Sequence, residues 1–385
     1  MFYKDSIRDF YPVAKLVVND EASLFSEKNF FSEGLNFRIK LGDINEVPFF
    51  EHVFYWSEAK LQDVTSNRNP AGALIMNLIS NFQQQGFSKA RSFFMNISDI
   101  VRQVTSAYIY PLGAPIQIIT PTVNQDTWYQ GNITDKAFIK KLEKVSFAPS
   151  FPNSGFVSFF NLAGEFYFVA VDQLLNQPPI ATLRYNVSDS PVGLGITPAE
   201  EIAKSVSKYN FSEFSFFGAG APTNMKNYSK IFYATDSTGI TTPLPAPLVS
   251  RFIPKGPLKL PILKSRSQLG PTEMHDFGII DGPGQINMYK GWQNRQLQDT
   301  LAFPYVMPIK TIFNPLLVSG KTVKIMIQSS DITRGKVAYE YSGNWVILES
   351  VHAVNHEGVA GTSVLLGKNA LNIHPTHPFY VDFIP

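Results

Sequence analysis

Cysteine is absent from the 385 residues of this chain. Disulfide bonds, zinc sites with thiolate ligands and cysteine nucleophiles are therefore excluded. Long apolar runs are absent too: no stretch of about eighteen apolar residues occurs, so the sequence predicts no membrane-spanning helix. The first residues, from Met1 to Asp5, lack the apolar core of a secretory signal, and we expect none.

Charged residues are few. They make up 17% of the chain, compared with about 25% in an average soluble protein. The 33 Lys and Arg residues nearly balance the 31 Asp and Glu residues, which leaves a net charge of +2. The one basic stretch, Lys255 to Arg266, is diluted by prolines and leucines. Because phosphate backbones are bound mostly by clustered positive side chains, sequence-specific nucleic-acid binding is not expected.

Phenylalanine, by contrast, is abundant, with 32 residues, and 44% of the chain is hydrophobic. Such a composition favours large buried cores, extensive contacts between subunits, or both. The length exceeds that of a typical domain, so we expect roughly two to four domains.

Short strands are predicted along much of the chain. Segments in which apolar and polar residues alternate, or in which β-branched and aromatic residues gather, are typical of strands. These segments are Ala14–Val18, Asn36–Leu41, His52–Trp56, Glu165–Val171, Ile231–Ala234, Thr322–Ile327, Asn344–Val351 and Gly361–Leu366. The chain is therefore expected to be mainly β.

Helices are predicted mostly in the middle of the chain. Asn69 is a plausible N-cap for a helix that runs from Pro70 to Phe82 with a recurring apolar face. The segments Phe93–Val104 and Phe156–Leu162 are further candidates. Thr197–Glu200 has the cap, proline and acid of a helix start, and Trp292–Leu301 reads as a short helix with a polar face.

Prolines mark the irregular parts. Three prolines interrupt Tyr108–Thr122, which is expected to be an edge strand or a loop. Seven prolines fall within Thr241–Pro271, which indicates a linker or an irregular insertion.

Histidine pairs and a glycine-rich segment were the candidates for metal and phosphate sites. His352 and His356 are four residues apart, but they fall on a strand end and a turn rather than on a helix. His374 and His377 stand between prolines with no third ligand nearby. Gly218–Pro222 is broken by proline and is predicted to be a turn. The sequence therefore predicts no metal site and no cofactor.

Carboxylates are the remaining candidates for catalysis. The acids of the mixed middle region that could form a pair for glycoside hydrolysis are Glu165, Asp172, Glu200 and Glu201. No Gly-x-Ser-x-Gly elbow is present. Because most such acids are merely solvated, a polysaccharide or peptidoglycan hydrolase is kept only as an alternative, and no catalytic residue is predicted.

The C-terminal strands resemble those of the central hub proteins of contractile-tail baseplates, a family related to the hub part of type VI secretion spikes. Trp345–His352 is similar to the family strand "Φ-x-V-x-E-V-x-H", with Ile347 and Ser350 where the pattern has Val. Thr362–Leu366 is similar to the "T-x-L-x-L" that follows, and Ser319–Ile325 to the "G-x-x-V-x-I" that precedes. The polar segment Asn294–Gln298 lies where hub proteins carry a short helix.

The N-terminal segments resemble the first barrel of the same family. They are Asp5–Ile7, Ala14–Asp20, Leu24, Phe25 and Gly34, followed by the helix expected up to Phe82. Family members usually have one or more strands before the segment that matches Asp5, and here only four residues precede it. We therefore expect a first barrel that is shortened or is completed by another chain.

The resemblance implies an α+β, mainly β fold with two small tail-tube-like β-barrel domains, an α+β middle region and an irregular insertion. The expected divisions are residues 1–66 for the first barrel, 67–212 for the middle domain, 213–250 with 302–372 for the second barrel, 251–301 for the insertion and 373–385 for a C-terminal strap.

The resemblance also implies a structural, non-enzymatic role in the virion, in a tail baseplate assembled in the host cytoplasm. A homotrimer would join the sixfold tail tube to the threefold central spike around a channel for the tape measure and DNA. The implied partners are the spike or lysozyme protein, the tail tube or its initiator, the tape measure protein and other baseplate proteins. The alternative is another tail-tip or fibre-attachment protein.

Overall fold

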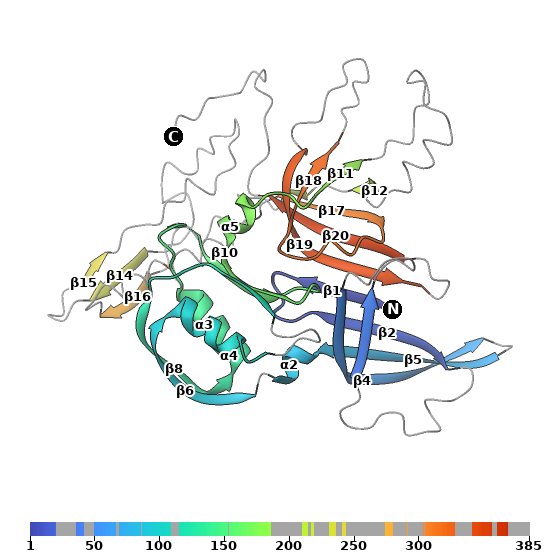
Figure 1. The fold of residues 1–385 in the computed structure, drawn as a ribbon, viewed down its shortest axis with the longest axis horizontal. Helices are drawn as coiled ribbons and strands as arrows, with labels where there is room; N and C mark the ends of the chain where they lie inside the picture. The colour runs from blue at the N-terminus through green and yellow to red at the C-terminus, as the bar shows by residue number, and fades with distance from the viewer. Residues whose placement is uncertain are drawn as a thin grey trace, which may run out of the picture.

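The computed structural model describes most of the first 185 residues and several strands beyond them. The described residues are 1–20, 36–41, 50–66, 69–85, 87–108, 115–152, 154–185, 210–214, 217–218, 231–235, 241–243, 274–279, 291, 303, 305–327, 341–355 and 360–368. Strands dominate them, and the helices are few and short (Figure 1). The α+β, mainly β fold class is therefore confirmed. No helix in this part of the chain is long and apolar enough to cross a membrane.

Five antiparallel strands form a sheet in the N-terminal part. In the order in which they pair, they are β1 (Phe2–Ser6), β2 (Val13–Asp20), β5 (Asn69–Ser80), β4 (Phe50–Ser66) and β3 (Asn36–Leu41). Along β1, Tyr3 and Asp5 are buried whereas Phe2 and Lys4 lie toward solvent, the period of two of a half-buried strand. The strands expected within residues 14–18, 36–41 and 52–56 are confirmed.

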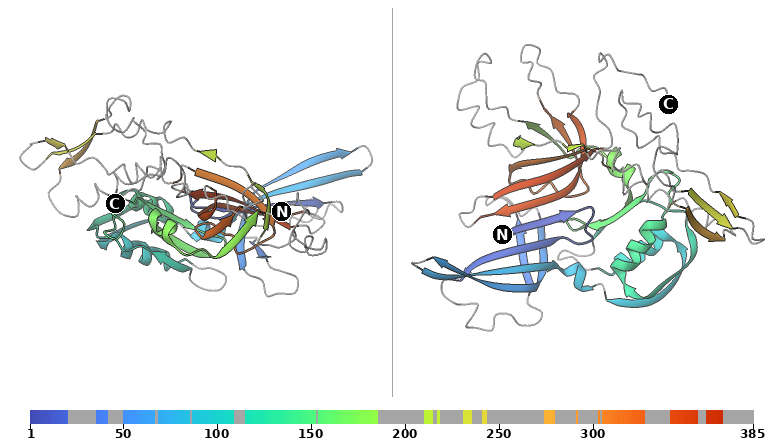
Figure 2. Two further views of the ribbon diagram at one scale, coloured as in Figure 1. Left: turned by 90° about the horizontal axis from the view of Figure 1, so that it is seen from above. Right: turned by 180° about the vertical axis from the view of Figure 1, so that it is seen from behind.

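The helix predicted over Pro70–Phe82 is wrong. The chain from Asn69 to Ser80 is strand β5, and only the five residues of α2 (Asn81–Gln85) are helical. Apolar residues that recur every four positions suit a helix, but they also suit one face of a strand, because four is a multiple of two. Tertiary pairing decides between the two: β4 pairs along the whole of β5, and β2 pairs on its other side. The far ends of β4 and β5 extend together away from the body (Figure 2).

Six strands in the C-terminal part are paired in a ring. They are β17 (Tyr305–Ile312), β12 (Asn210–Phe214), β11 (Ala181–Tyr185), β18 (Thr322–Met326), β19 (Gly343–Val354) and β20 (Ala360–Lys368). Each pairs with the next, and β20 pairs back to β17; the two-residue β13 (Phe217–Gly218) adds to β17. A cluster around the fully buried Trp345, with Ile325, Ile347 and Leu366, lies between these strands. The strands expected in 322–327, 344–351 and 361–366 are confirmed.

Strand β19 joins the two sheets. Its first residues pair with β18, and its later residues, from Glu349 to Ala353, pair with β1 on the same side. The N-terminal sheet therefore continues directly into the C-terminal ring (Figure 1).

The middle region is a separate α+β unit. It contains an antiparallel pair, β6 (Ser88–Asn96) with β8 (Gln125–Thr134), and a three-stranded sheet of β7 (Ile116–Ile119), β10 (Glu165–Ala170) and β9 (Phe156–Phe160). Its helices are α3 (Ile97–Thr105), α4 (Asp135–Val145) and α5 (Val171–Asn176). Its core is largely aromatic: Phe160 contacts Phe10, Phe82 and Phe166. The strand expected over 165–171 is confirmed, and β7 is an edge strand as the prolines predicted.

The helix predicted over Phe156–Leu162 is also wrong, because residues 156–160 form β9, in which every side chain is buried. A continuous apolar run has no period, so it fits a buried strand as well as a buried helix. The helix expected over Phe93–Val104 begins only at Ile97, after the end of β6.

A further small sheet contains β14 (Ile231–Thr235), β15 (Thr241–Pro243) and β16 (Met274–Ile279). The strand expected over 231–234 is thereby confirmed. The helices expected at 197–200 and 292–301, the strap 373–385 and most of the proline-rich stretch 241–271 lie outside the described residues.

Replacing Gly320 with Ala is expected to lower the free energy of unfolding by about 2 kcal/mol. Gly320 has a φ of +83°, and an added Cβ would lie 2.5 Å from the ring of Phe159. Denaturant unfolding checks this, with Gly131→Ala as the control, because a Cβ at Gly131 meets no atom within 4 Å. Equal losses in the two variants would contradict the prediction.

Candidate functional site

The structure describes two of the four acids considered for hydrolysis, Glu165 and Asp172. Glu165, at the start of β10, accepts from Lys321 Nζ at 2.7 Å and from Asn161 Nδ2 at 2.7 Å. Asp172 is buried on α5, and its backbone N–H donates to a serine hydroxyl. The other two acids, Glu200 and Glu201, lie outside the described residues.

His352 points into the protein. It is buried on β19, where its ring nitrogens bond the hydroxyls of Ser350 (3.1 Å) and Thr362 (2.9 Å). Burial lowers the pKa of His352 to about 4, so the ring is neutral at pH 7. His356, His374 and His377 lie outside the described residues, as do residues 219–222 of the glycine-rich segment. The described residues contain no group of three potential metal ligands.

Asp5 holds three parts of the chain together. Its carboxylate accepts the backbone N–H of Leu162, just after β9, at 2.8 Å. It also accepts the backbone N–H of Ser319, in the loop before β18, at 3.2 Å to each oxygen. Two more backbone bonds tie the segment after β1 to the same regions, from Ile7 to Leu348 and from Phe160 to Phe10. We call the contacts of Asp5 with Leu162 and Ser319 the junction.

The junction carboxyl is completely buried. Burial raises the pKa of Asp5 to about 7, and the charge of Glu349 also raises it, while the hydrogen bonds from Leu162 and Ser319 lower it. In the sequence, Asp5 stands out only as part of the hub-like segment Asp5–Ile7, and its inward position is seen in the structure. Its partners, up to 314 residues away, had no signal in the sequence.

A second feature is a continuous sheet face that crosses both halves of the protein. The strand registers place outward-facing residues side by side from β5 through β2, β1, β19 and β20 to β17. We call this the outer face, and its residues are Ile75, Asn77, Ile79, Val13, Lys15, Val17, Phe2, Lys4, Glu349, Val351, Ala353, Gly361, Ser363, Lys310 and Ile312.

The outer face is rich in apolar side chains. Phe2, Val13, Val17 and Ile312 are exposed there. Among its charged groups, Lys4 and Glu349 form an ion pair of 2.9 Å. An exposed apolar area spread over several strands is typical of a surface that another molecule covers.

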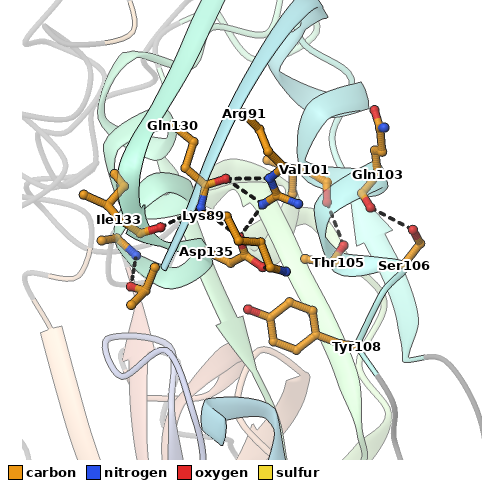
Figure 3. A network of polar contacts seen from close by, with 12 residues as sticks. Lys89, Arg91, Val101, Gln103, Thr105, Ser106, Tyr108, Gln130, Ile133 and Asp135 are labelled. Atoms are coloured by element: carbon orange, nitrogen blue, oxygen red, sulfur yellow. Dashed lines mark hydrogen bonds and ion pairs between the residues drawn. The ribbon is translucent and has the colours of Figure 1, made fainter. Parts of the chain in front are cut away.

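The middle unit contains a separate polar network (Figure 3). Asp135 is fully buried at the first residue of α4, and it accepts from Lys89 Nζ at 3.0 Å, from Gln130 Nε2 at 2.9 Å and from Arg91. The two basic side chains on β6 therefore turn inward and neutralise a buried charge, which stabilises the unit rather than forming a binding surface.

No family model matches the sequence, and no curated protein matches it either. The comparison with solved structures does find similar folds. A tail protein from Neisseria meningitidis has a TM-score of 0.50 and 10% identity, with 95% of this chain and 91% of that chain covered.

Two further structures are more distant. A 43 kDa prophage tail protein from Shewanella oneidensis has a TM-score of 0.48 and 8% identity, with 96% and 93% of the two chains covered. A type VI secretion component of Escherichia coli, described as similar to T4 bacteriophage tail proteins, has a TM-score of 0.43 and 8% identity, with 96% and 74% covered. The similarity to the Neisseria meningitidis structure shows that the chain shares the fold of a tail protein, in agreement with the fold expected from its sequence.

Proposed function

We propose that the chain is a structural hub protein of a phage tail baseplate, without enzymatic activity, and that it acts as a homotrimer in the virion. The observation that carries the proposal is the outer face, which runs unbroken from the N-terminal sheet to the C-terminal ring. A hub must present a continuous wall to its neighbours, and one sheet face shared by both halves suits that task. The fold shared with a tail protein supports the same function.

In this proposal the N-terminal sheet and the C-terminal ring are the two barrel-like units of each chain. Three copies then supply six units, which match a sixfold tail tube on one side and a threefold spike on the other. The partners are the spike or lysozyme protein, the tube or tube initiator, the tape measure protein and other baseplate proteins, and DNA passes through the central channel. The division at residue 66 stays a prediction, and it falls between two strands that pair along their length.

The chemistry of the outer face supports permanent association. Large obligate interfaces are more apolar than the remaining surface, and they bury upwards of about 2,000 Å² in total. Four of the fifteen outer-face residues are charged, and two of these, Lys4 and Glu349, already neutralise each other in an ion pair.

Replacing Val17 with Glu is expected to prevent trimer formation. Val17 is 50% exposed on the outer face, so a glutamate should leave the fold intact but bring a buried charge into each interface. Light scattering should give about 129 kDa for the wild type, three copies of a 43.1 kDa chain, and a smaller mass for the variant. The matched control is Val123→Glu in the middle unit, where Val123 is 41% exposed and lies off the outer face.

Stoichiometry separates this proposal from the alternative. A wild-type chain that stays monomeric or forms a hexamer would favour another tail-tip or fibre-attachment role. A trimer that survives Val17→Glu but not Val123→Glu would move the interface to the middle unit and contradict the role of the outer face.

A further inference from the structure

We propose that Lys321 and Asn161 become joined by an intramolecular amide bond, which the folded protein forms by itself with Glu165 as the acid and base. The bond would link the side-chain nitrogen of the lysine to the side-chain carbonyl carbon of the asparagine and would release ammonia. This modification is independent of the proposed hub function.

The two reacting side chains share one carboxylate. Lys321 Nζ lies 2.7 Å from Glu165 Oε1, and Asn161 Nδ2 lies 2.7 Å from Glu165 Oε2. The amine and the amide are therefore only two hydrogen bonds apart, on the same acidic group. A nucleophile and a leaving group that both contact one carboxyl group can exchange protons through it without moving far.

The amide of Asn161 is held in one orientation. Its Oδ1 accepts the backbone N–H of Glu165 at 3.0 Å, the position from which a donor stabilises negative charge that develops on that oxygen. Asn161 is fully buried, and its own backbone N–H is bonded to the Glu165 carbonyl at 3.0 Å. The amide has therefore little freedom to turn away.

A stacked aromatic pair lies beside the site. Phe159 and Tyr167 are stacked with their centroids 4.8 Å apart, and Lys321 Nζ lies 5.8 Å from the centre of the Tyr167 ring. Burial raises the pKa of Tyr167, so its hydroxyl stays protonated and donates to Glu165 Oε2 at 3.0 Å. Gly320 lets the loop that carries Lys321 approach Phe159, because no larger residue would fit there.

The reaction balances without a cofactor or an oxidant. Glu165 takes one proton from the lysine ammonium, and the neutral amine attacks the side-chain carbonyl carbon of Asn161. The new C–N bond forms while the backbone N–H of Glu165 stabilises the oxygen. Glu165 then passes a proton to the departing nitrogen and removes the surplus proton from the new amide. One lysine ammonium and one amide become a secondary amide and one ammonium ion, and the carboxylate is regenerated.

The intact mass of the full-length wild-type chain tests the proposal. We expect the wild-type mass to lie below that of the unmodified polypeptide by one ammonia. Proteolysis should yield a branched peptide that contains both Lys321 and Asn161. Glu165→Gln and Lys321→Arg should each give the full mass of their sequence, because the first removes the base and the second removes the amine.

The matched control is Lys140→Arg. Lys140 also forms an ion pair with a buried acid, Glu143, at 2.8 Å, but it belongs to a different site. This variant should still lack one ammonia. The proposal is overturned if the wild-type protein has its full mass and Lys321 and Asn161 are recovered in separate unmodified peptides. It is also overturned if Lys321→Arg still lacks the ammonia.

Discussion

Lowering the pH from 7 to 4 is expected to reduce the free energy of unfolding by about 3 kcal/mol, mainly through two buried histidines. Burial lowers the pKa of His52 to about 3 and that of His352 to about 4. In the unfolded chain both rings take up a proton near pH 6.5, whereas in the folded protein they stay neutral. The stability that they contribute is thus present above pH 6.5 and is lost as the pH falls.

Asp5 works in the opposite direction. Its pKa is raised from 3.8 to about 7, so its contribution to stability is present at low pH and is lost as the pH rises toward 7. Between pH 6.5 and 4 the two histidines bind about two protons in the unfolded chain and few in the folded protein. Over most of the same range the Asp5 carboxyl is protonated in the folded protein but ionised in the unfolded chain. Each unmatched proton is worth about 1.4 kcal/mol per pH unit, so a net loss on acidification remains.

Denaturant unfolding at a series of pH values checks the prediction, and His352→Gln sharpens it. Glutamine can keep polar contacts with Ser350 and Thr362 but does not titrate. With one histidine removed, the remaining histidine and Asp5 should nearly cancel between pH 4 and 6.5, and the stability should become almost independent of pH there. If the free energy of unfolding of the variant falls with pH as steeply as that of the wild type, another group causes the acid sensitivity.

The sequence allowed the strands to be predicted better than the helices, for a physical reason. Alternation is visible in the sequence where one face of a strand is buried and the other faces solvent, as along β3, and that strand was predicted correctly. The short strand β1 was not predicted. Spacings of four, as in Leu74, Leu78 and Phe82, belong to both periods, and pairing with both β2 and β4 makes the segment up to Ser80 a strand. The apolar run at Phe156 has no polar face to reveal its period.

The candidate site was harder to predict. Neither the inward position of Asp5 nor its partners were predicted, because both depend on the tertiary fold. The outer face depends on the register of six strands, of which β1 and β19 lie at opposite ends of the chain. The sequence marks Glu165 as one of the acids of the mixed middle region, yet its contact with Lys321 joins residues 156 positions apart. Local patterns carry no information about such pairs.

Replacing Asp5 with Ala is expected to destabilise the protein by about 4 kcal/mol at pH 7. The change leaves the buried N–H groups of Leu162 and Ser319 without their acceptor, and each unsatisfied group costs about 1 to 3 kcal/mol. The variant no longer has to desolvate a carboxyl group on folding, and this offsets part of the loss. Asp99→Ala is the control, because Asp99 is exposed and pairs with Arg102 on the same helix; its loss should stay below about 0.5 kcal/mol.

Hydrogen exchange distinguishes a loss of the junction from a general loss of stability. If Asp5 couples β1 to the middle unit and to the C-terminal ring, the amides of Leu162 and Ser319 should exchange faster in Asp5→Ala than the global destabilisation requires. For amides in the core of the middle unit, such as that of Phe168, the exchange rate should change only as much as the global stability changes. Uniform changes at all these amides would mean that Asp5 stabilises the N-terminal sheet alone. Faster exchange at both Leu162 and Ser319 would instead show that the buried side chain of Asp5 couples the stability of three segments that are distant in sequence. Such coupling is what the proposed hub needs if its N-terminal sheet and C-terminal ring act as one rigid body.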